Sequence, residues 1–518
     1  MHIVENKSYP KKSKKIYQSI LLRESYRENG KVKKRTIANL SHCKPEEIAA
    51  IKLALKHKDN LSELGSLKEG VTLQEGLSVG AIWTVYQIAK RIGIERALGT
   101  TNFAGKLCMW QVIARVIEQG SRLSAVRLAQ VHAACDVLDM RRGFDENDLY
   151  ENLSWLADNQ QKIERALFSV RRKKKEPEIF LYDVTSSYLE GTNNFFGEYG
   201  YNRDGKKGKQ QIVIGLLCDE SGEPVSAEVF AGNTQDTQTF ASQVKKVAER
   251  FGCERVTFVG DRGMIKIPQI KNLPEGFHYI TAITKPQIDS LIDQGVIQMG
   301  LFDEEVFEVE DDGIRYILRR NPVRVEEINE SRISKRKSVE KLLKKKNIYL
   351  RKHARAKVET AIKDVNKKIV QLKIDKWLKV ISQERTLKLE VDNNVLEEAS
   401  RLDGCYVIKT DLPKDVADKQ IIHDRYKDLA EVERAFRTCK TDFLEVRPVY
   451  VQTEKNTRGH VFVVMLAYMI VRILRDAWKQ FDLTVEEGLK QLSTLCSTEV
   501  KVKKQGSCIQ IPRPREKS

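Results

Sequence analysis

The chain has 518 residues, 41% of them hydrophobic, and its 90 Lys and Arg residues outnumber 72 Asp and Glu residues to give a net charge of +18. This length allows three or four domains with their own cores, and the charge favours a polyanionic partner such as nucleic acid. Nine scattered cysteines without a CxxC pair argue against a disulfide framework or a zinc ribbon. The N-terminus lacks the apolar segment of a secretory signal, and the apolar run 461–471 is about half the length of a membrane span. We therefore expect a cytoplasmic protein with no membrane partner.

Two segments carry almost the entire positive charge. Residues 331–376 hold 17 Lys and Arg against 4 Asp and Glu, and residues 1–42 hold 11 against 3. A lysine-rich helix is often only a solvated surface, so either segment alone is a weak indication. Two such segments in one chain strengthen the interpretation that the partner is nucleic acid.

The N-terminal segment, 1–60, is predicted to form a β-hairpin followed by a helix. Residues 16–40 favour two strands that turn at Asn29-Gly30, the strongest short turn signal, and the second strand is rich in lysine. Residues 41–57 are typical of a helix with Pro45 in its first turn.

A polar linker and a helical region follow. Residues 58–72 are polar and contain glycine, which is typical of a linker. From 76 to about 167 the apolar residues have helical spacing. The basic run 171–175 and Pro177 mark a boundary after it. We expect three tryptophans of this region to anchor its core: Trp83, Trp110 and Trp155.

After this boundary the sequence pattern changes to short runs of β-branched and aromatic residues. These runs predict strands, with one helix between the third and the fourth. This order indicates a mixed α/β layer. The predicted strands are 179–184, 211–219, 224–230, 255–261 and 278–283, and the helix is 236–252.

The second half mixes both patterns. Residues 287–330 predict short strands, the basic segment 331–376 predicts two helices, and a strand is expected again at 405–410. A helix at 426–440 and a second, strongly apolar helix after it should be buried. We expect the C-terminal segment, 499–518, to be flexible.

The helix predicted at 426–440 has an unusual polar ridge beside its apolar stripe. Tyr426, Glu433 and Lys440 are each seven residues apart, about two helical turns, so their side chains align at the rim of the core. A carboxylate between a phenol and an ammonium there requires an explanation. The stripe itself consists of Leu429, Val432, Phe436, Cys439 and Phe443.

Two aspartates occupy the ends of predicted strands, where chemistry is usually carried out in α/β sheets. Asp183 lies in or at the end of the first strand and Asp261 ends the fourth. With Glu433 they could form an oxygen-only cage, which Mg²⁺ or Mn²⁺ prefers, and two such ions could drive an in-line phosphodiester displacement.

Each of these carboxylates also has an ordinary structural interpretation. An aspartate that closes a strand is more often a turn former or a cap, as we expect for Asp219 at a hairpin and for Asp236 at a helix N-terminus. Glu433 could pair with Arg437 four residues later.

Several motifs together resemble one family. The spacing Tyr426-x2-Leu429-x3-Glu433-x6-Lys440 resembles the Y-x2-R-x3-E-x6-K signature of bacterial insertion-sequence transposases with an Asp-Asp-Glu triad, the DDE transposases. The motifs DVTSSYLEG and GDRGM are similar to the first and second Asp motifs of that family, and AGNTQD is similar to its connecting segment. The N-terminal hairpin is also similar, so the resemblance covers most of the chain. Leu429 departs from the signature, which has Arg there.

The resemblance implies a fold and a site. It implies an α/β fold with a ribonuclease-H-like mixed-sheet core, interrupted by a β-rich and helical insertion and preceded by the hairpin–helix module and a helical domain. Asp183, Asp261 and Glu433 would be catalytic and hold two Mg²⁺ ions, with Mn²⁺ as a substitute. Tyr426 and Lys440 would bind DNA phosphates, and Arg425, Arg434 or Arg437 could replace the signature Arg there.

The same resemblance implies the function. We expect a transposase that binds the terminal inverted repeats of its insertion sequence, cleaves double-stranded DNA and transfers it to target DNA, as a homodimer in the bacterial cytoplasm and on the nucleoid. The alternative is a non-cleaving DNA-binding regulator or domesticated relative with the same fold. A third interpretation, an RNA-processing nuclease with the same two-metal chemistry, is disfavoured by the resemblance alone. The expected segments are 1–60 (DNA-end binding), 73–172 (helical), 173–285 (first part of the core), 286–403 (insertion), 404–480 (second part of the core) and 481–518 (C-terminal helix and tail).

Overall fold

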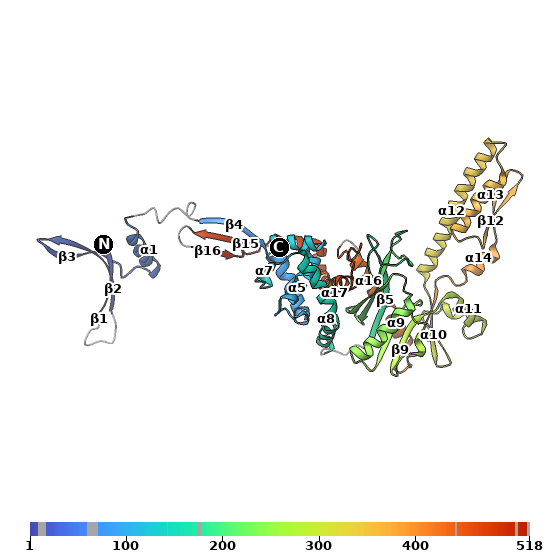
Figure 1. Cartoon of the computed structure of the whole chain (residues 1–518), viewed down its shortest axis with the longest axis horizontal. Coiled ribbons are helices and arrows are strands. Elements are labelled where there is room, and N and C mark those ends of the chain that lie inside the picture. The colour runs from blue at the N-terminus through green and yellow to red at the C-terminus, as the bar shows by residue number, and fades with distance from the viewer. Residues whose placement is uncertain are drawn as a thin grey trace. The chain divides into compact units, whose positions relative to one another are not determined.

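The computed structural model describes residues 1–8, 17–59, 71–141, 143–172, 178–440, 443–502 and 506–514 (Figure 1). The chain divides into two compact units. Unit 1 comprises Met1–Ser78 with Thr494–Ser518, and unit 2 comprises Val79–Ser493. Among the described residues, no helix has both the length and the apolar character that crossing a membrane requires.

Unit 1 contains the predicted hairpin, which is confirmed. Strand β2 (Tyr17–Glu28) pairs with β3 (Lys31–Asn39), and the turn residues Asn29 and Gly30 have φ values of 51° and 77°, as a two-residue hairpin turn requires. Strand β1 (His2–Ser8), which sequence reasoning missed, adds to the other edge of β2. Helix α1 (Pro45–Lys56) follows as predicted.

Unit 1 also contains a three-stranded sheet of β4 (Val71–Ser78), β15 (Cys496–Val502) and β16 (Gly506–Gln510), with β15 in the middle. The expectation that the C-terminal segment is flexible is therefore wrong for these strands. Strand β4 precedes unit 2 in the sequence and β15 follows it, so a local pattern could not show that the two strands pair. Most of the predicted linker, residues 60–70, lies outside the described residues.

Unit 2 begins with the predicted helical region. Trp110 is fully buried in its core, but Trp83 is 52% exposed, so its prediction as a core anchor is wrong. The apolar helix α17 (Glu454–Trp478) is buried as predicted and packs against α8, α5 and the sheet strand β7. The other helices are α3 (Gly80–Arg91), α4 (Ile94–Leu98), α5 (Phe103–Ile117), α6 (Arg122–Val131), α7 (Ala134–Val137), α8 (Glu146–Arg172) and α18 (Val485–Ser493).

An eight-stranded mixed sheet forms the centre of unit 2, in the order β10-β11-β14-β9-β8-β5-β6-β7. Strand β5 runs parallel to β8, β8 runs parallel to β9, and the other pairs are antiparallel. All five strands predicted between 179 and 283 are present. The strands are β5 (Ile179–Tyr188), β6 (Gln211–Asp219), β7 (Pro224–Ala231), β8 (Val256–Gly260), β9 (Phe277–Ala282), β10 (Phe307–Asp311), β11 (Ile314–Arg320) and β14 (Cys405–Thr410).

Both faces of the central strands are covered, so successive residues enter different cores. On β5, Leu181 packs with α17 on one face, while Phe180 and Tyr182 pack with Phe240 on the other. Phe240 belongs to helix α9 (Asp236–Lys245), which continues as a π-helical turn, η2 (Lys246–Arg250). A short helix, α10 (Ile267–Lys271), follows β8.

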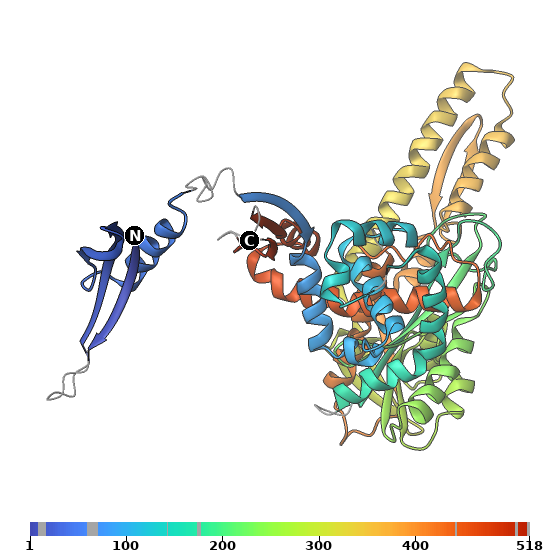
Figure 2. The same cartoon turned by 60° about the vertical axis from the view of Figure 1, so that its left-hand side comes forward.

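Between β9 and β14 the chain adds two sheet strands and a separate subdomain. The first helix predicted within the basic segment 331–376 begins earlier, as α12 (Pro322–Lys352), because Asn321 caps its N-terminus by accepting a hydrogen bond from the Arg324 amide. Figures 1 and 2 show α12 running away from the sheet with α13 and a hairpin beside it. The remaining elements are α11 (Lys285–Asp293), η3 (Met299–Asp303), α13 (Val358–Gln371), β12 (Leu378–Gln383), β13 (Thr386–Val391) and α14 (Asn393–Ser400).

This subdomain, which we call the arm (322–403), has its own core of Val339, Leu350, Val365, Ile369 and Trp377. It leaves and returns at one point of the sheet. The Asn321 amide donates to the Gly404 carbonyl over 2.9 Å, directly beyond the pairing of Arg320 with Cys405.

The helix predicted at 426–440 is divided in two. Helix α15 (Lys419–Lys427) is capped by Asp428, and α16 (Leu429–Lys440) begins at the next residue. The Glu431 amide bonds to the carbonyl of Asp428, three residues earlier, so the local turn is tighter than an α-helix. The apolar stripe still faces the core, where Val432, Ala435 and Phe436 are buried.

Candidate active site

The register of two parallel strands places two aspartates side by side. Tyr182 on β5 pairs with Gly260 on β8, so the next residues, Asp183 and Asp261, continue from neighbouring positions. Neighbouring strands lie about 4.8 Å apart, so these two carboxylates start from adjacent positions on the central strands of the sheet. Asp183 is half-buried on the central strand, and Asp261 is exposed where β8 ends.

Helix α16 adds the third carboxylate. It packs against β5 through its buried face and presents Glu433 on its exposed side. Asp183, Asp261 and Glu433 line one cleft of about 300 Å³, together with Arg203 and Asp236. The structure therefore brings together the three carboxylates that the sequence singled out, although Asp261 and Glu433 lie far apart along the chain.

The electrostatics of the cleft centre on Asp183. Burial, and then the negative charges of Asp261 and Glu433, raise the pKa of Asp183 to about 7, while a hydrogen bond from the Val184 amide (2.7 Å) and the charge of Arg203 oppose the rise. An oxygen-only set of carboxylates that repel one another suits a divalent cation, which would relieve that repulsion. Within the described residues, however, no three acidic, His or Cys side chains already stand at the separation that would hold one ion.

Tyr426 faces the second aspartate. It is the last-turn residue of α15, and burial raises the pKa of its phenol, with the charge of Asp261 and a hydrogen bond to that carboxylate as further causes. The phenol of Tyr426 thus lies close to the Asp261 carboxylate, beside the cleft.

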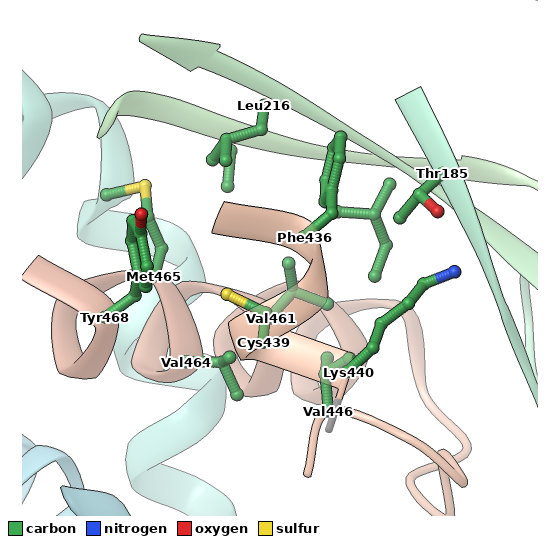
Figure 3. Close-up of a pocket in the computed structure, with 12 residues that line it drawn as sticks. Thr185, Leu216, Phe436, Cys439, Lys440, Val446, Val461, Val464, Met465 and Tyr468 are labelled. Carbon is green, nitrogen blue, oxygen red and sulfur yellow. The ribbon is translucent and has the colours of Figure 1, made fainter. Parts of the chain in front are cut away.

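Lys440 is enclosed by an ion-pair cluster. Its ammonium lies 2.8 Å from Asp204, whose side chain is 1% exposed and also pairs with Arg447. Figure 3 shows the lysine chain lying along a small apolar cavity, with its nitrogen on the side of Thr185. Burial lowers the pKa of Lys440, and the bond to Asp204 opposes that effect. The cluster of two cations and one anion keeps a formal charge of +1.

Three arginines near Tyr426, Glu433 and Lys440 differ in their partners. Arg434 pairs with Glu431 over 2.8 Å and Arg425 pairs with Asp428 over 3.1 Å. Arg437 is exposed, and within the described ranges it has no ion pair, with Glu433 or with any other residue. Leu429, which replaces the signature Arg, packs against the core.

One residue of the cleft was misassigned from sequence. Asp219 forms the expected hairpin turn, accepting hydrogen bonds from Ser221 and Glu223. Asp236 was expected to cap α9, but the cap position is Gln235, and Asp236 instead binds Arg203 through two 2.8 Å bonds. Arg203 lies in a long loop after β5, where no periodicity marks it.

Two family models match the chain. The model described as IS1634 family transposase, N-terminal domain, matches residues 6–67, and the model described as transposase DDE domain matches residues 174–470. No curated protein matches the chain.

Solved structures give more distant similarities. A chain of the piggyBac transposase synaptic complex with hairpin DNA is 10% identical with a TM-score of 0.35, over 79% of this chain and 75% of that one. A chain of the Mos1 transposase paired-end complex with left transposon end is 14% identical with a TM-score of 0.13, over 34% of this chain and 52% of that one. The assignment rests on the family models alone. Since the DDE domain model spans more than half of the sequence, the chain belongs to the insertion-sequence DDE transposases, which cleave DNA and transfer its strands in cut-and-paste transposition.

Proposed function

We propose that Asp183, Asp261 and Glu433 are the catalytic carboxylates of this transposase. The observation that carries the proposal is their convergence on one cleft from two neighbouring parallel strands and one helix. We further infer a ribonuclease-H-like core in strands β5 to β9. Their order, β7-β6-β5-β8-β9, with three antiparallel strands followed by two parallel to the first, supports this inference.

The family generally uses divalent metal ions, and we propose two Mg²⁺ ions, replaceable by Mn²⁺, at these three carboxylates. When bound, such ions activate the attacking oxygen and stabilise the leaving oxygen of a phosphodiester. The side chains prepare the site: Asp183 supplies a carboxylate that ionises near neutral pH, and the phenol of Tyr426 lies close to Asp261. Glu433 stands on an exposed helix face, from which it can approach the two aspartates.

We propose that Tyr426, Lys440, Arg434 and Arg437 contact DNA phosphates beside the cut. Arg437 is the best replacement for the signature Arg because it is exposed and unpaired in the described structure, whereas Arg434 already pairs with Glu431. Lys440 can contribute because an ammonium has three donors and its cluster keeps a positive charge.

The two basic segments are the proposed surfaces for duplex DNA. In unit 1, Lys31 and Lys34 of the hairpin are exposed, which supports recognition of the terminal inverted repeats there, with two copies of the chain synapsing two ends on the nucleoid. In the arm, four exposed cations of α12 fall within about 80° of arc, opposite the buried Val339 and Leu350. We call them the basic ridge: Lys337, Lys341, Lys344 and Arg351.

The basic ridge spans about 21 Å of helix, at about 1.5 Å per residue. Duplex DNA carries one phosphate per roughly 1.7 Å of its axis, so a ridge of this length faces several phosphates. None of its four cations has an ion-pair partner in the described ranges, which leaves their charges available to DNA.

A cleavage assay tests the catalytic assignment. Glu433→Gln keeps the size of the side chain and removes its charge, so we expect cleavage of a plasmid carrying the element ends in Mg²⁺ to be lost while DNA affinity stays within about twofold. The matched control is Glu275→Gln at an exposed glutamate of the same unit, which should leave cleavage near the wild-type rate. Wild-type cleavage by the Glu433 variant would refute the assignment.

A further inference from the structure

The loop between β5 and β6, residues 189–210, exposes an unusual set of aromatic side chains. Phe195, Tyr199 and Tyr201 are 66%, 62% and 81% exposed. Lysines follow in the same loop at 206, 207 and 209; Lys209 pairs with Glu190, and the Lys206 ammonium lies 5.5 Å from the centre of the Tyr188 ring. Aromatic rings interleaved with cations are typical of surfaces that bind nucleic-acid strands, where bases stack on the rings and cations neutralise phosphates.

The backbone that carries Tyr201 is held firmly although its ring is exposed. The buried Gln211 donates from Nε2 to the Tyr201 carbonyl over 3.1 Å and to the Gly232 carbonyl over 2.8 Å. Next to Tyr201, a Cβ on Gly200 would lie 2.1 Å from the Gly232 oxygen, so the loop and the end of β7 are in close contact. On the other side, Arg203 is fixed by its two bonds to Asp236. Because the backbone around Tyr201 is already constrained, little conformational entropy is lost when a ligand binds to the exposed ring.

Tyr201 lines a second cleft, which adjoins the carboxylates. This cleft has about 430 Å³ of space and a polar lining that includes Gln211, Asn233, Gln235 and Lys266. Three residues line both clefts: Arg203, Asp236 and Gly263. The guanidinium of Arg203 lies 5.5 Å from the centre of the Tyr201 ring. Arg203 therefore links an aromatic surface directly to the carboxylate cleft.

We propose that this second cleft binds an unpaired nucleobase of the DNA strand whose phosphate lies at Asp183, Asp261 and Glu433. The base stacks on Tyr201, and Lys206 and Lys207 face the adjoining phosphates. This deepens the proposed function, since it rests on the carboxylate cleft being the place of cleavage. Enzymes acting on DNA often need a nucleotide out of the stack, and a fixed aromatic ring beside the reacting phosphate stabilises that state.

Binding measured without cleavage tests the proposal. Two fluorescent random-sequence duplexes of equal paired length are compared in EDTA, one fully paired and one with a three-nucleotide single-stranded 3′ extension. We expect the wild type to prefer the extended duplex. Tyr201→Ala should weaken binding of the extended duplex by about 5- to 150-fold, the usual range for one base–aromatic stack, and binding of the paired duplex by less than twofold.

Two further variants make the result specific. Tyr201→Phe keeps the ring and should keep the preference, and Phe481→Ala removes another exposed ring (64% exposed) and should change neither affinity. The proposal is overturned if the wild type shows no preference, or if Tyr201→Ala affects both duplexes equally. Because no cleavage occurs in EDTA, this outcome is independent of the Glu433→Gln experiment, and either hypothesis can fail alone.

Discussion

Asp183→Asn should stabilise the metal-free protein, because the carboxylate is held in an unfavourable environment. Its pKa is raised from an ordinary 3.8 to about 7 by burial and by two neighbouring carboxylates. About three pH units at roughly 1.4 kcal/mol each make the ionised form cost up to about 4 kcal/mol of folding free energy. Asparagine keeps the oxygen that accepts the Val184 amide hydrogen bond and removes the charge.

The sign of the pH dependence follows from the direction of the shift. The folded protein holds this proton more tightly than the unfolded chain, so wild-type stability falls as the pH rises from about 4 to 7 and is then level. The variant does not titrate at this position. Its advantage should be full at pH 8.5, about half as large at pH 5.5, and absent below pH 4.

Urea denaturation in EDTA, followed by tryptophan fluorescence, measures the difference. All five tryptophans lie in unit 2, so the signal reports the unit that contains Asp183. Asp415→Asn, at an exposed aspartate, is the matched control and should change stability by less than about 0.5 kcal/mol. An Asp183→Asn variant that is less stable than the wild type at pH 8.5, or whose advantage does not shrink at pH 5.5, would refute the reasoning.

Two further predictions concern charge. Replacing the four cations of the basic ridge by glutamines should reduce the slope of log affinity against log salt for duplex DNA by about 3.6, near 0.9 per lost phosphate contact. The equally charged control, glutamine at Lys90, Arg91, Lys271 and Lys479, should reduce it by less than 1, and equal effects would contradict the role of the ridge. Asp204→Ala leaves Lys440 and Arg447 unpaired in a poorly solvated place and should cost about 3 kcal/mol in urea denaturation. A loss below about 1 kcal/mol would show that the cluster contributes little.

Local pattern predicted the central sheet because its strands are buried on both faces. Residues 212–218 form a continuous apolar run, and β6 has the predicted bounds, 211–219. The carboxylates could be selected for a similar reason: Asp183 interrupts an apolar strand, and Glu433 interrupts the rim of an apolar stripe. A polar group at such a position needs a partner, and this need is visible in the sequence.

Contacts between distant segments could not be predicted in the same way. Asp204 lies in a loop without periodicity, and its partners Lys440 and Arg447 follow only after the arm and the rest of the sheet. The pairing of β15 with β4 spans the whole of unit 2. Trp83 shows a different limit of sequence-based prediction. Its large apolar side chain predicts a core residue, but its position on α3 leaves it half-exposed.

The single point at which the arm departs from the sheet and rejoins it bears on how this enzyme can change. Since neighbouring antiparallel strands close the excursion at Asn321 and Gly404, its contents can lengthen, shrink or be exchanged without shifting the strands on either side. Glu433 follows the arm in the sequence, yet its helix α16 packs against β5, the strand that carries Asp183. Segments of different length can thus be inserted between Asp261 and Glu433 while the three carboxylates keep their places around one cleft.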